Sequence, residues 1–272
     1  MEKGILYLVA TPIGNLEDIT LRAIKVLKDV DVVAAEDTRQ TLKLLNHLNI
    51  SKPLISYHRH NEEIKKDLLI EKLNSGESIA VVTDAGTPAI SDPGEEIVSE
   101  AIKNNIRIIP IPGACALINA LIASGLDTKE FSFYAFLPLN KKLRKIKFEE
   151  IKRDGKTAIL YEAPHKLINT LKDILSNLGD RNIVIAKEIT KIHETFIRGK
   201  VSEILEIIKE PKGEYIILIQ GEKIKEENTL NSLSLEEHYK FYEKEGYDKK
   251  EIIKKIAKDR GVNKNEIYQK FI

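Results

Sequence analysis

The chain has 272 residues, 42% of them hydrophobic, which is enough for two domains with cores of their own. Its single cysteine, Cys115, excludes an intramolecular disulfide and suits a reducing compartment. The net charge of +1 excludes a uniformly basic surface but leaves room for a local basic patch that binds nucleic acid.

The first half alternates short apolar runs with segments of helical period. We predict strands at 5–10, 31–35, 54–56, 78–83 and 107–111, and helices at 21–28, 38–48, 60–74, 92–104 and 113–124. This alternation is typical of a mostly parallel sheet covered by helices on both faces. Ligands of such sheets bind beyond the carboxyl ends of the strands.

One uncharged stretch, 108–126, approaches the length of a membrane span. Its prolines and Gly113 favour a strand, a turn and a buried helix instead, so we expect no membrane partner. The first 20 residues lack the pattern of a secretory signal. We therefore expect a cytoplasmic protein.

The second half contains strands predicted at 131–136, 157–161, 182–187, 194–199 and 214–221. No helix fits between the third and fourth of these, which predicts a mixed sheet. In the tail, Ser234, Asp248 and Asn263 each precede a glutamate by three residues, and Gly246 and Gly261 follow as stops, which predicts three short helices. The predicted organisation is an N-terminal α/β domain at 1–125, a second at 126–222, a linker at 223–233 and a helical domain at 234–272.

The strongest local motif is "VVTDAGTPAISDPGEEI", 81–97, in which a buried strand opens into two acid-plus-glycine turns. These turns favour a rigid loop whose backbone amides and Thr87 hydroxyl face a ligand. The alternative is a plain turn and helix start, with Asp92 as the cap. "IPGACA", 111–116, is a similar junction, where Gly113 would let a ligand approach the backbone closely.

Seven motifs occur here in one order: "YLVATPIGNLEDITLRA", "AAEDTR", "VVTDAGTPAISDPG", "IPGACA", "FLP", "LYEAPHKL" and "AKEITKIHE". With these the chain closely resembles, over nearly its whole length, the small-subunit ribosomal RNA (cytidine-2′-O-)-methyltransferase I family of the tetrapyrrole methylase superfamily. One departure is Ala114, where family members often have proline. The resemblance implies an α/β, two-domain tetrapyrrole-methylase-like fold with a mostly parallel first sheet, a mixed second sheet and a small helical tail.

The resemblance also implies that S-adenosyl-L-methionine binds in the cleft between the two α/β domains, and that no metal is needed. Residue by residue, it assigns the cofactor to the strand-end loops: Pro12, Ile13, Gly14, Asp84, Ala85, Gly86, Thr87, Pro88, Gly113, Ala114 and Cys115. It further implies a cytidine 2′-O-methyl product in 16S rRNA, either free 16S rRNA or the small ribosomal subunit as partner, and a homodimer.

Methyl transfer to a ribose hydroxyl needs alignment and removal of the hydroxyl proton. The base stays open, because no lysine-aspartate-lysine-glutamate tetrad can be assigned. The catalytic candidates all stand at predicted strand ends: Glu36, Asp37, Arg39, His58, Glu162 and His165. Each has a plain structural alternative, such as a helix cap or a solvated side chain.

Two segments are basic enough to contact RNA. Residues 140–156 hold eight Lys or Arg against three acids, and 248–272 hold eight against four. Our RNA-contact candidates are Lys141, Lys142, Arg144, Lys145, Lys254 and Lys255. Solvated helix faces are the alternative.

Two other functions remain open at this point. One is C-methylation of tetrapyrroles, against which the "TPIGN" loop and the basic tail count. The other is a DNA-binding regulator that uses the tail, which resembles a helix-turn-helix but offers few base-reading side chains in "NKNEIYQK".

Overall fold

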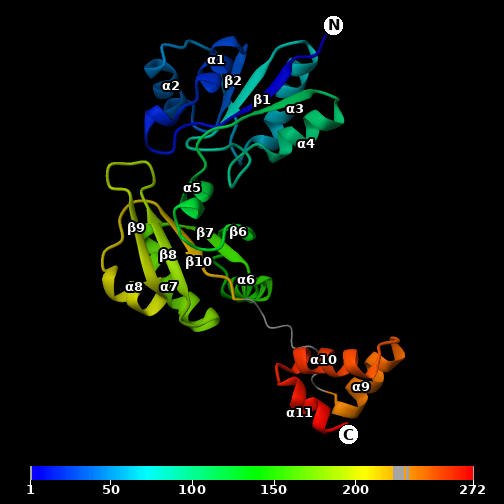
Figure 1. The fold of residues 1–272 in the computed structure, drawn as a ribbon. Coiled ribbons are helices and arrows are strands. Elements are labelled where there is room, and N and C mark those ends of the chain that lie inside the picture. The colour runs from blue at the N-terminus through cyan, green and yellow to red at the C-terminus, as the bar shows by residue number, and fades with distance from the viewer. Residues whose placement is uncertain (1, 223–229, 231–232, 272) are drawn as a thin grey trace. The chain divides into compact units, whose positions relative to one another are not determined.

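The computed structural model describes residues 2–222, 230 and 233–271 (Figure 1). The chain divides into two compact units, residues 1–221, which hold both sheets, and 222–272, which hold the last three helices. The predicted linker at 223–233 falls almost wholly outside the described residues. Among the helices that the structure describes, none is long and apolar enough to span a membrane.

The first sheet has five strands in the order β3-β2-β4-β1-β5, and every pairing in it is parallel. The strands are β1 (Ile5–Val9), β2 (Val32–Ala35), β3 (Leu54–Ser56), β4 (Ile79–Val82) and β5 (Arg107–Ile111). Since all run the same way, the five loops that follow them emerge at one edge of the sheet.

Two pairs of helices cover the two faces of this sheet. One core contains α1 (Leu21–Asp29) and α2 (Thr38–His47), and the opposite core contains α3 (Glu62–Asn74) and α4 (Glu95–Lys103). The strands β2 and β4 are buried along their whole length, which explains their unbroken apolar sequence. A short 3-10 helix, η1 (Leu16–Asp18), precedes α1.

The second sheet is mixed, in the order β6-β7-β10-β8-β9. Only β6 and β7 pair in parallel. Its strands are β6 (Phe131–Phe136), β7 (Thr157–Glu162), β8 (Asn182–Lys187), β9 (Thr195–Lys200) and β10 (Tyr215–Ile219).

Four helices pack on this second sheet. One face is covered by α6 (Lys141–Asp154), α7 (Pro164–Leu178) and α8 (Val201–Ile207), and the other by α5 (Ala116–Ile122). The predicted domain boundary after residue 125 would place α5 in the first domain, whereas its buried face contacts β7, β8 and β10.

The second unit consists of α9 (Leu235–Lys244), α10 (Lys249–Arg260) and α11 (Lys264–Gln269) around a small core. Ser234 and Asp248 form the predicted capping boxes with Glu237 and Glu251. Asn263 caps the third helix through the Asn265 amide alone, so the predicted box with Glu266 is wrong.

The predicted fold class is confirmed: a parallel first sheet, a mixed second sheet and a helical tail. The alternative in which Asp92 caps α4 is wrong, because the helix begins at Glu95 after Gly94, whose φ is 140°. Helix α8 was not predicted, because its seven residues directly continue strand β9 without a loop.

Candidate active site

Three of the strand-end loops are joined to one another by hydrogen bonds. Thr11 and Gly86 form an isolated antiparallel bridge, with N–H···O distances of 2.9 and 3.1 Å. The Thr87 hydroxyl donates to the carbonyl oxygen of Ala114 at 3.1 Å. The loops after β1, β4 and β5 therefore form one continuous wall. The Thr87 hydroxyl donates inside this wall, so a ligand contact there would use its oxygen as an acceptor.

Gly86 and Gly113 allow these loops to pack closely against one another. Gly86 has a φ of +92°, and a Cβ there would lie 3.2 Å from Ile13 Cγ2. A Cβ on Gly113 would lie 2.8 Å from the Ala10 Cβ, so this glycine lets two loops pack together. Packing between the loops thus accounts for Gly113, and the close approach of a ligand there stays a prediction.

A cleft of about 330 Å³ lies between this wall and the second sheet. Its lining is mainly apolar and aromatic, and it holds three carboxylates but no lysine or arginine: Ile13, Ala85, Ala116, Phe136, Tyr161, Glu162, Ala163, Pro164, Ala186, Glu188, Ile189, Glu214, Tyr215 and Ile216. The volume and the few polar groups are typical of a small-molecule site.

Two of the cleft carboxylates are held by a lysine outside the lining. Lys191 Nζ lies 3.1 Å from Glu188 and 2.8 Å from Glu214. Glu188 also accepts a hydrogen bond from the Glu214 amide, and this bond lowers the pKa of Glu188. Lys191 packs against Gly14, where any side chain would collide with it. Gly14 thus positions the ion pair at the cleft.

Carboxylates gather beside the cleft at the carboxyl edge of the first sheet. The Asp84 carboxylate accepts from the Asp37 amide at 3.0 Å, and the Glu36 carboxylate accepts from the Asp84 amide at 3.4 Å. Burial raises the pKa of Glu36, and the neighbouring Asp84 charge adds to this. Two acidic side chains, Asp84 and Glu36, thereby join the loops after β2 and β4 by hydrogen bonds.

Asp92, which the sequence placed in one of the two acid-plus-glycine turns but not among the catalytic candidates, completes this cluster. Burial raises its pKa to about 6, and the charge of Glu36 adds to the effect. Asp92 also raises the pKa of Tyr161, a cleft residue, although burial and Cys115 contribute more to that shift. Asp92 was missed because its position rests on a fold of the 84–94 loop that no sequence pattern specifies.

The remaining catalytic candidates in the loops after β2 and β3 are Asp37, Arg39 and His58, and they differ in their interactions. Asp37 caps α2 and pairs with Arg39 at 2.8 Å, and this partner lowers the pKa of Asp37 to about 2. An acid held ionised in this way is a poor base. His58 lies close enough to Glu36 to lower its pKa, and the buried His58 Nδ1 has no partner among the described residues.

Of the two catalytic candidates at the end of β7, Glu162 lines the cleft and His165 does not. Glu162 is 5% exposed and lines the cleft, and its oxygens accept from the Ala163 amide at 2.9 Å and the Thr170 hydroxyl at 2.5 Å. His165 is exposed in the first turn of α7 and does not line the cleft. The structure therefore does not bring His165 to the site.

The predicted cofactor residues divide between two hollows. Ile13 and Ala85 line the cleft, while Gly113 and Ala114 line a second hollow of about 440 Å³ together with Asn119 and other residues. Cys115 packs in the core under α5. Neither Pro12 nor Pro88 is among the residues that line the cleft or this second hollow.

The residues predicted to contact RNA differ in exposure and in their interactions within the protein. Lys141, Lys142 and Lys145 are exposed on α6, and Lys254 is exposed on α10. Arg144 instead pairs with Asp173 at 2.7 Å and is only 15% exposed, which leaves it less available to a phosphate than these lysines. The Lys255 ammonium lies 4.0 Å from the centre of the Tyr247 ring.

Residues 5–205 match the family model of tetrapyrrole (corrin/porphyrin) methylases. The ribosomal RNA small subunit methyltransferase I of Halalkalibacterium halodurans is 52% identical, over 98% of this chain and 94% of that protein. The protein of the same name from Bacillus subtilis is 48% identical, over 99% and 94%.

Solved structures share the fold at low sequence identity. Diphthine synthase superposes with a TM-score of 0.64 at 14% identity, over 80% of this chain and 90% of that one. Uroporphyrin-III C-methyltransferase from Thermus thermophilus, complexed with S-adenosyl homocysteine, gives a TM-score of 0.56 at 18% identity, over 79% and 97%.

Proposed function

The chain belongs to the tetrapyrrole methylase family, in which its relatives are named ribosomal RNA small subunit methyltransferase I, and from this we propose that it is an S-adenosyl-L-methionine-dependent methyltransferase. It methylates the ribose 2′-oxygen of a cytidine in the 16S rRNA of the small ribosomal subunit. The membership confirms the resemblance drawn from "TPIGNLEDIT" and "DAGTPAISDPG".

The chemistry of the cleft carries this proposal. Its lining offers aromatic and aliphatic surface for an adenine and carboxylates for a cation, without any lysine or arginine for a polyphosphate. An S-adenosyl group, with its sulfonium and ammonium, therefore fits the residues present. Ile13 and Ala85 would bound it on the first-sheet side, and Phe136 and Tyr161 on the other.

The bound cofactor supplies an electrophilic methyl group. The chain's own task is to orient the ribose hydroxyl and to accept its proton. Among the described carboxylates, the Glu36–Asp84–Asp92 cluster suits the second task best. The pKa of Asp92, about 6, leaves this acid ionised at neutral pH yet basic enough to take a proton. The charge of Glu36 contributes to the raised pKa of Asp92, after burial.

The decisive experiment incubates the purified chain with methyl-labelled S-adenosyl-L-methionine and small ribosomal subunits. Nuclease digestion should then yield label in 2′-O-methylcytidine. Label in a base, or label appearing in a tetrapyrrole instead of RNA, would contradict the proposal. A deoxyribose at the target position removes the acceptor oxygen and should abolish labelling while leaving binding nearly intact.

The proposed substrate also implies where in the cell the protein acts. A ribosomal substrate places the enzyme in the cytoplasm. The homodimer implied by the resemblance stays a prediction, which light scattering on the full chain would test. The tail gives little support to a DNA-binding regulator, since α11 has only six residues, Lys264–Gln269, with which to enter a groove.

A further inference from the structure

A third hollow, of about 610 Å³, lies between α6 and α7. Lys141 and Lys145 line it from α6, and Lys166 and Lys172 line it from α7. The two pairs come from segments that are separate in the sequence. Only Lys141 and Lys145 belong to the basic run at 140–156, so the sequence alone did not reveal the cluster.

The hollow has an excess of positive charge that the protein leaves unbalanced. Within the described residues, no hydrogen bond or ion pair joins any of the four lysine ammonium groups to another side chain. The one acid of the lining, Asp173, is already paired with Arg144 at 2.7 Å. Four like charges around one hollow repel each other unless an anion enters it.

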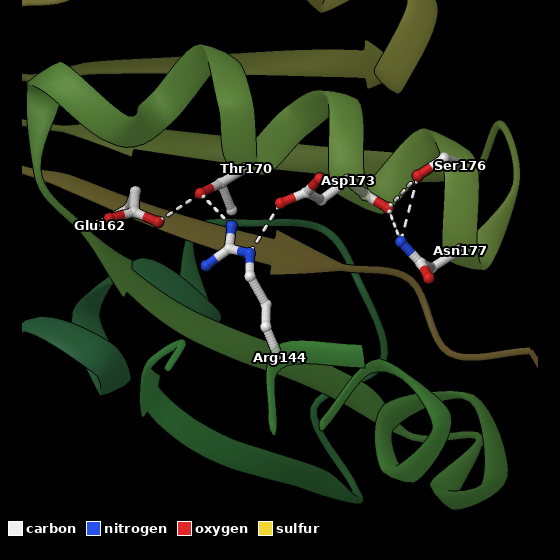
Figure 2. A network of polar contacts seen from close by, with 6 residues as sticks. All are labelled: Arg144, Glu162, Thr170, Asp173, Ser176 and Asn177. Carbon is white, nitrogen blue, oxygen red and sulfur yellow. Dashed lines mark hydrogen bonds and ion pairs between the residues drawn. The ribbon is translucent and has the colours of Figure 1, made fainter. Parts of the chain in front are cut away.

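A short chain of hydrogen bonds connects this hollow with the cleft (Figure 2). Arg144 donates to the Thr170 hydroxyl at 2.7 Å, and that hydroxyl donates to the Glu162 carboxylate at 2.5 Å. Arg144 and Thr170 line the hollow, whereas Glu162 lines the cleft. The hydrogen-bonded side chains of Thr170 and Glu162 therefore connect the lining of the hollow with that of the cleft.

We propose that the hollow between α6 and α7 holds phosphates of the RNA strand whose target nucleotide enters the cleft. The inference rests on the proposed function and names the surface that the RNA backbone uses. Lys141, Lys145, Lys166 and Lys172 neutralise the phosphates, and Arg144 keeps the two helices at the spacing that the strand requires. Phosphate contacts of this kind position a nucleic acid without reading its sequence.

The test compares two double variants of the full chain. Lys145→Ala/Lys166→Ala removes one ammonium group from each wall of the hollow. Lys129→Ala/Lys152→Ala removes two exposed lysines of the same half that do not line it. For each protein, the affinity for free 16S rRNA and for small subunits is measured between 50 and about 200 mM salt, as is the affinity for S-adenosyl-L-methionine.

The hollow variant should flatten the slope of log affinity against log salt by about 1.4, the value for two lost contacts with single-stranded RNA. Its KM for subunits should rise while kcat and cofactor affinity stay at the wild-type values. The control variant should change the slope far less. Arg144→Ala, which loosens the wall without removing a phosphate ligand, should raise the KM with a smaller change in slope.

Other results overturn the inference, and they differ from a failure of the proposed function. Equal slopes in the hollow and control variants, with a wild type that methylates rRNA, would refute the hollow alone. Lost affinity for subunits but not for free rRNA would assign the hollow to a ribosomal protein. A wild type that neither binds nor methylates rRNA would remove both proposals.

Discussion

The Tyr57 hydroxyl donates a hydrogen bond to Glu62 Oε1 at 3.0 Å, and the same oxygen accepts one from the Gly94 amide at 2.8 Å. Glu62, in the first turn of α3, thus fastens the end of the 84–94 loop to the first core. The backbone of that loop is strained, because Ala89 and Ser91 have φ angles of +67° and +66°, which residues other than glycine rarely adopt. Contacts such as those of Glu62 are needed to hold this conformation.

Replacing Glu62 with alanine should therefore destabilise the protein and loosen the cofactor wall. The change leaves the Tyr57 hydroxyl and the Gly94 amide without their acceptor, at a cost of about 2–4 kcal/mol in the free energy of unfolding. Urea denaturation measures this, with the neighbouring exposed Glu63→Ala as the matched control. Glu62→Gln keeps an acceptor oxygen and should recover most of the loss. Equal stability of the two alanine variants would contradict the role of Glu62.

Ala85→Leu should abolish cofactor binding without harming the fold. Ala85 is exposed and lines the cleft, so a larger side chain occupies the cleft and creates no cavity elsewhere. This change is a cleaner test than Gly86→Val, because the φ of +92° at Gly86 penalises any side chain. Calorimetry with S-adenosyl-L-methionine gives the affinity.

The control for that experiment also decides between the two hollows. Ala123→Leu enlarges an exposed residue that lines the hollow shared with Gly113 and Ala114. We expect its cofactor affinity to stay near that of the wild type. The reverse pattern, with binding lost in Ala123→Leu and kept in Ala85→Leu, would move the cofactor to the other hollow.

Asp92→Asn should lower turnover while cofactor affinity persists. An amide cannot accept the proton that the carboxylate takes, and general-base catalysis typically contributes about 10²–10⁴-fold. In the wild type, kcat should fall as the pH drops below about 6, where Asp92 becomes protonated. Single-turnover methylation across pH 5–8 measures both effects. A wild-type rate in Asp92→Asn would direct the search to Glu36→Gln and to His58.

The same substitution should stabilise the fold at neutral pH. The pKa of Asp92 is raised from 3.8 to about 6, so the protonated acid favours the folded state, fully below pH 4 and no longer above about 6. The shift corresponds to at most about 3 kcal/mol, and solvent reduces this, so we expect a gain of about 1–2 kcal/mol for Asp92→Asn at pH 8. At pH 4 the two proteins should unfold alike.

His238 should make the tail unit sensitive to acid. Its ring is fully buried, its Nε2 lies 3.3 Å from Asp259, and Arg260 donates to its Nδ1 at 3.3 Å. Burial lowers the pKa of His238, although the Asp259 contact opposes this. The unfolded chain therefore binds a proton more readily, and the tail loses stability as the pH falls below 6.5.

Amide hydrogen exchange on the full chain reports the tail separately from the sheets. Protection in α9 and α10 should decline between pH 7 and 5 relative to protection in the first sheet. His238→Gln cannot titrate there, so its tail should lose less protection over the same range. An equal decline in both proteins would assign the effect to other groups.

The apolar runs in the sequence located the strands well. A parallel strand that is buried on both faces, such as "IAVV" at 79–82, needs an apolar side chain at every position. It also placed Glu36, Asp37 and Asp84 at one edge, since parallel strands bring their ends together. The cluster with Asp92 was out of reach, because it depends on unusual φ angles inside a loop. The lysine hollow was missed for another reason: α6 and α7 pack across β7, and no local pattern pairs Lys145 with Lys166.

The strand order of the second sheet governs when the enzyme matures during synthesis. Strand β10 is the last of that sheet to be made, yet it lies at the centre, between β7 and β8. The strands before it can form only two separate pairs, β6 with β7 and β8 with β9, until residues 215–219 arrive. The first sheet, by contrast, is complete once β5 has been made, at residue 111. One wall of the cleft is therefore complete long before the other, and a chain that ends before Tyr215 has only two unjoined strand pairs to place opposite that wall.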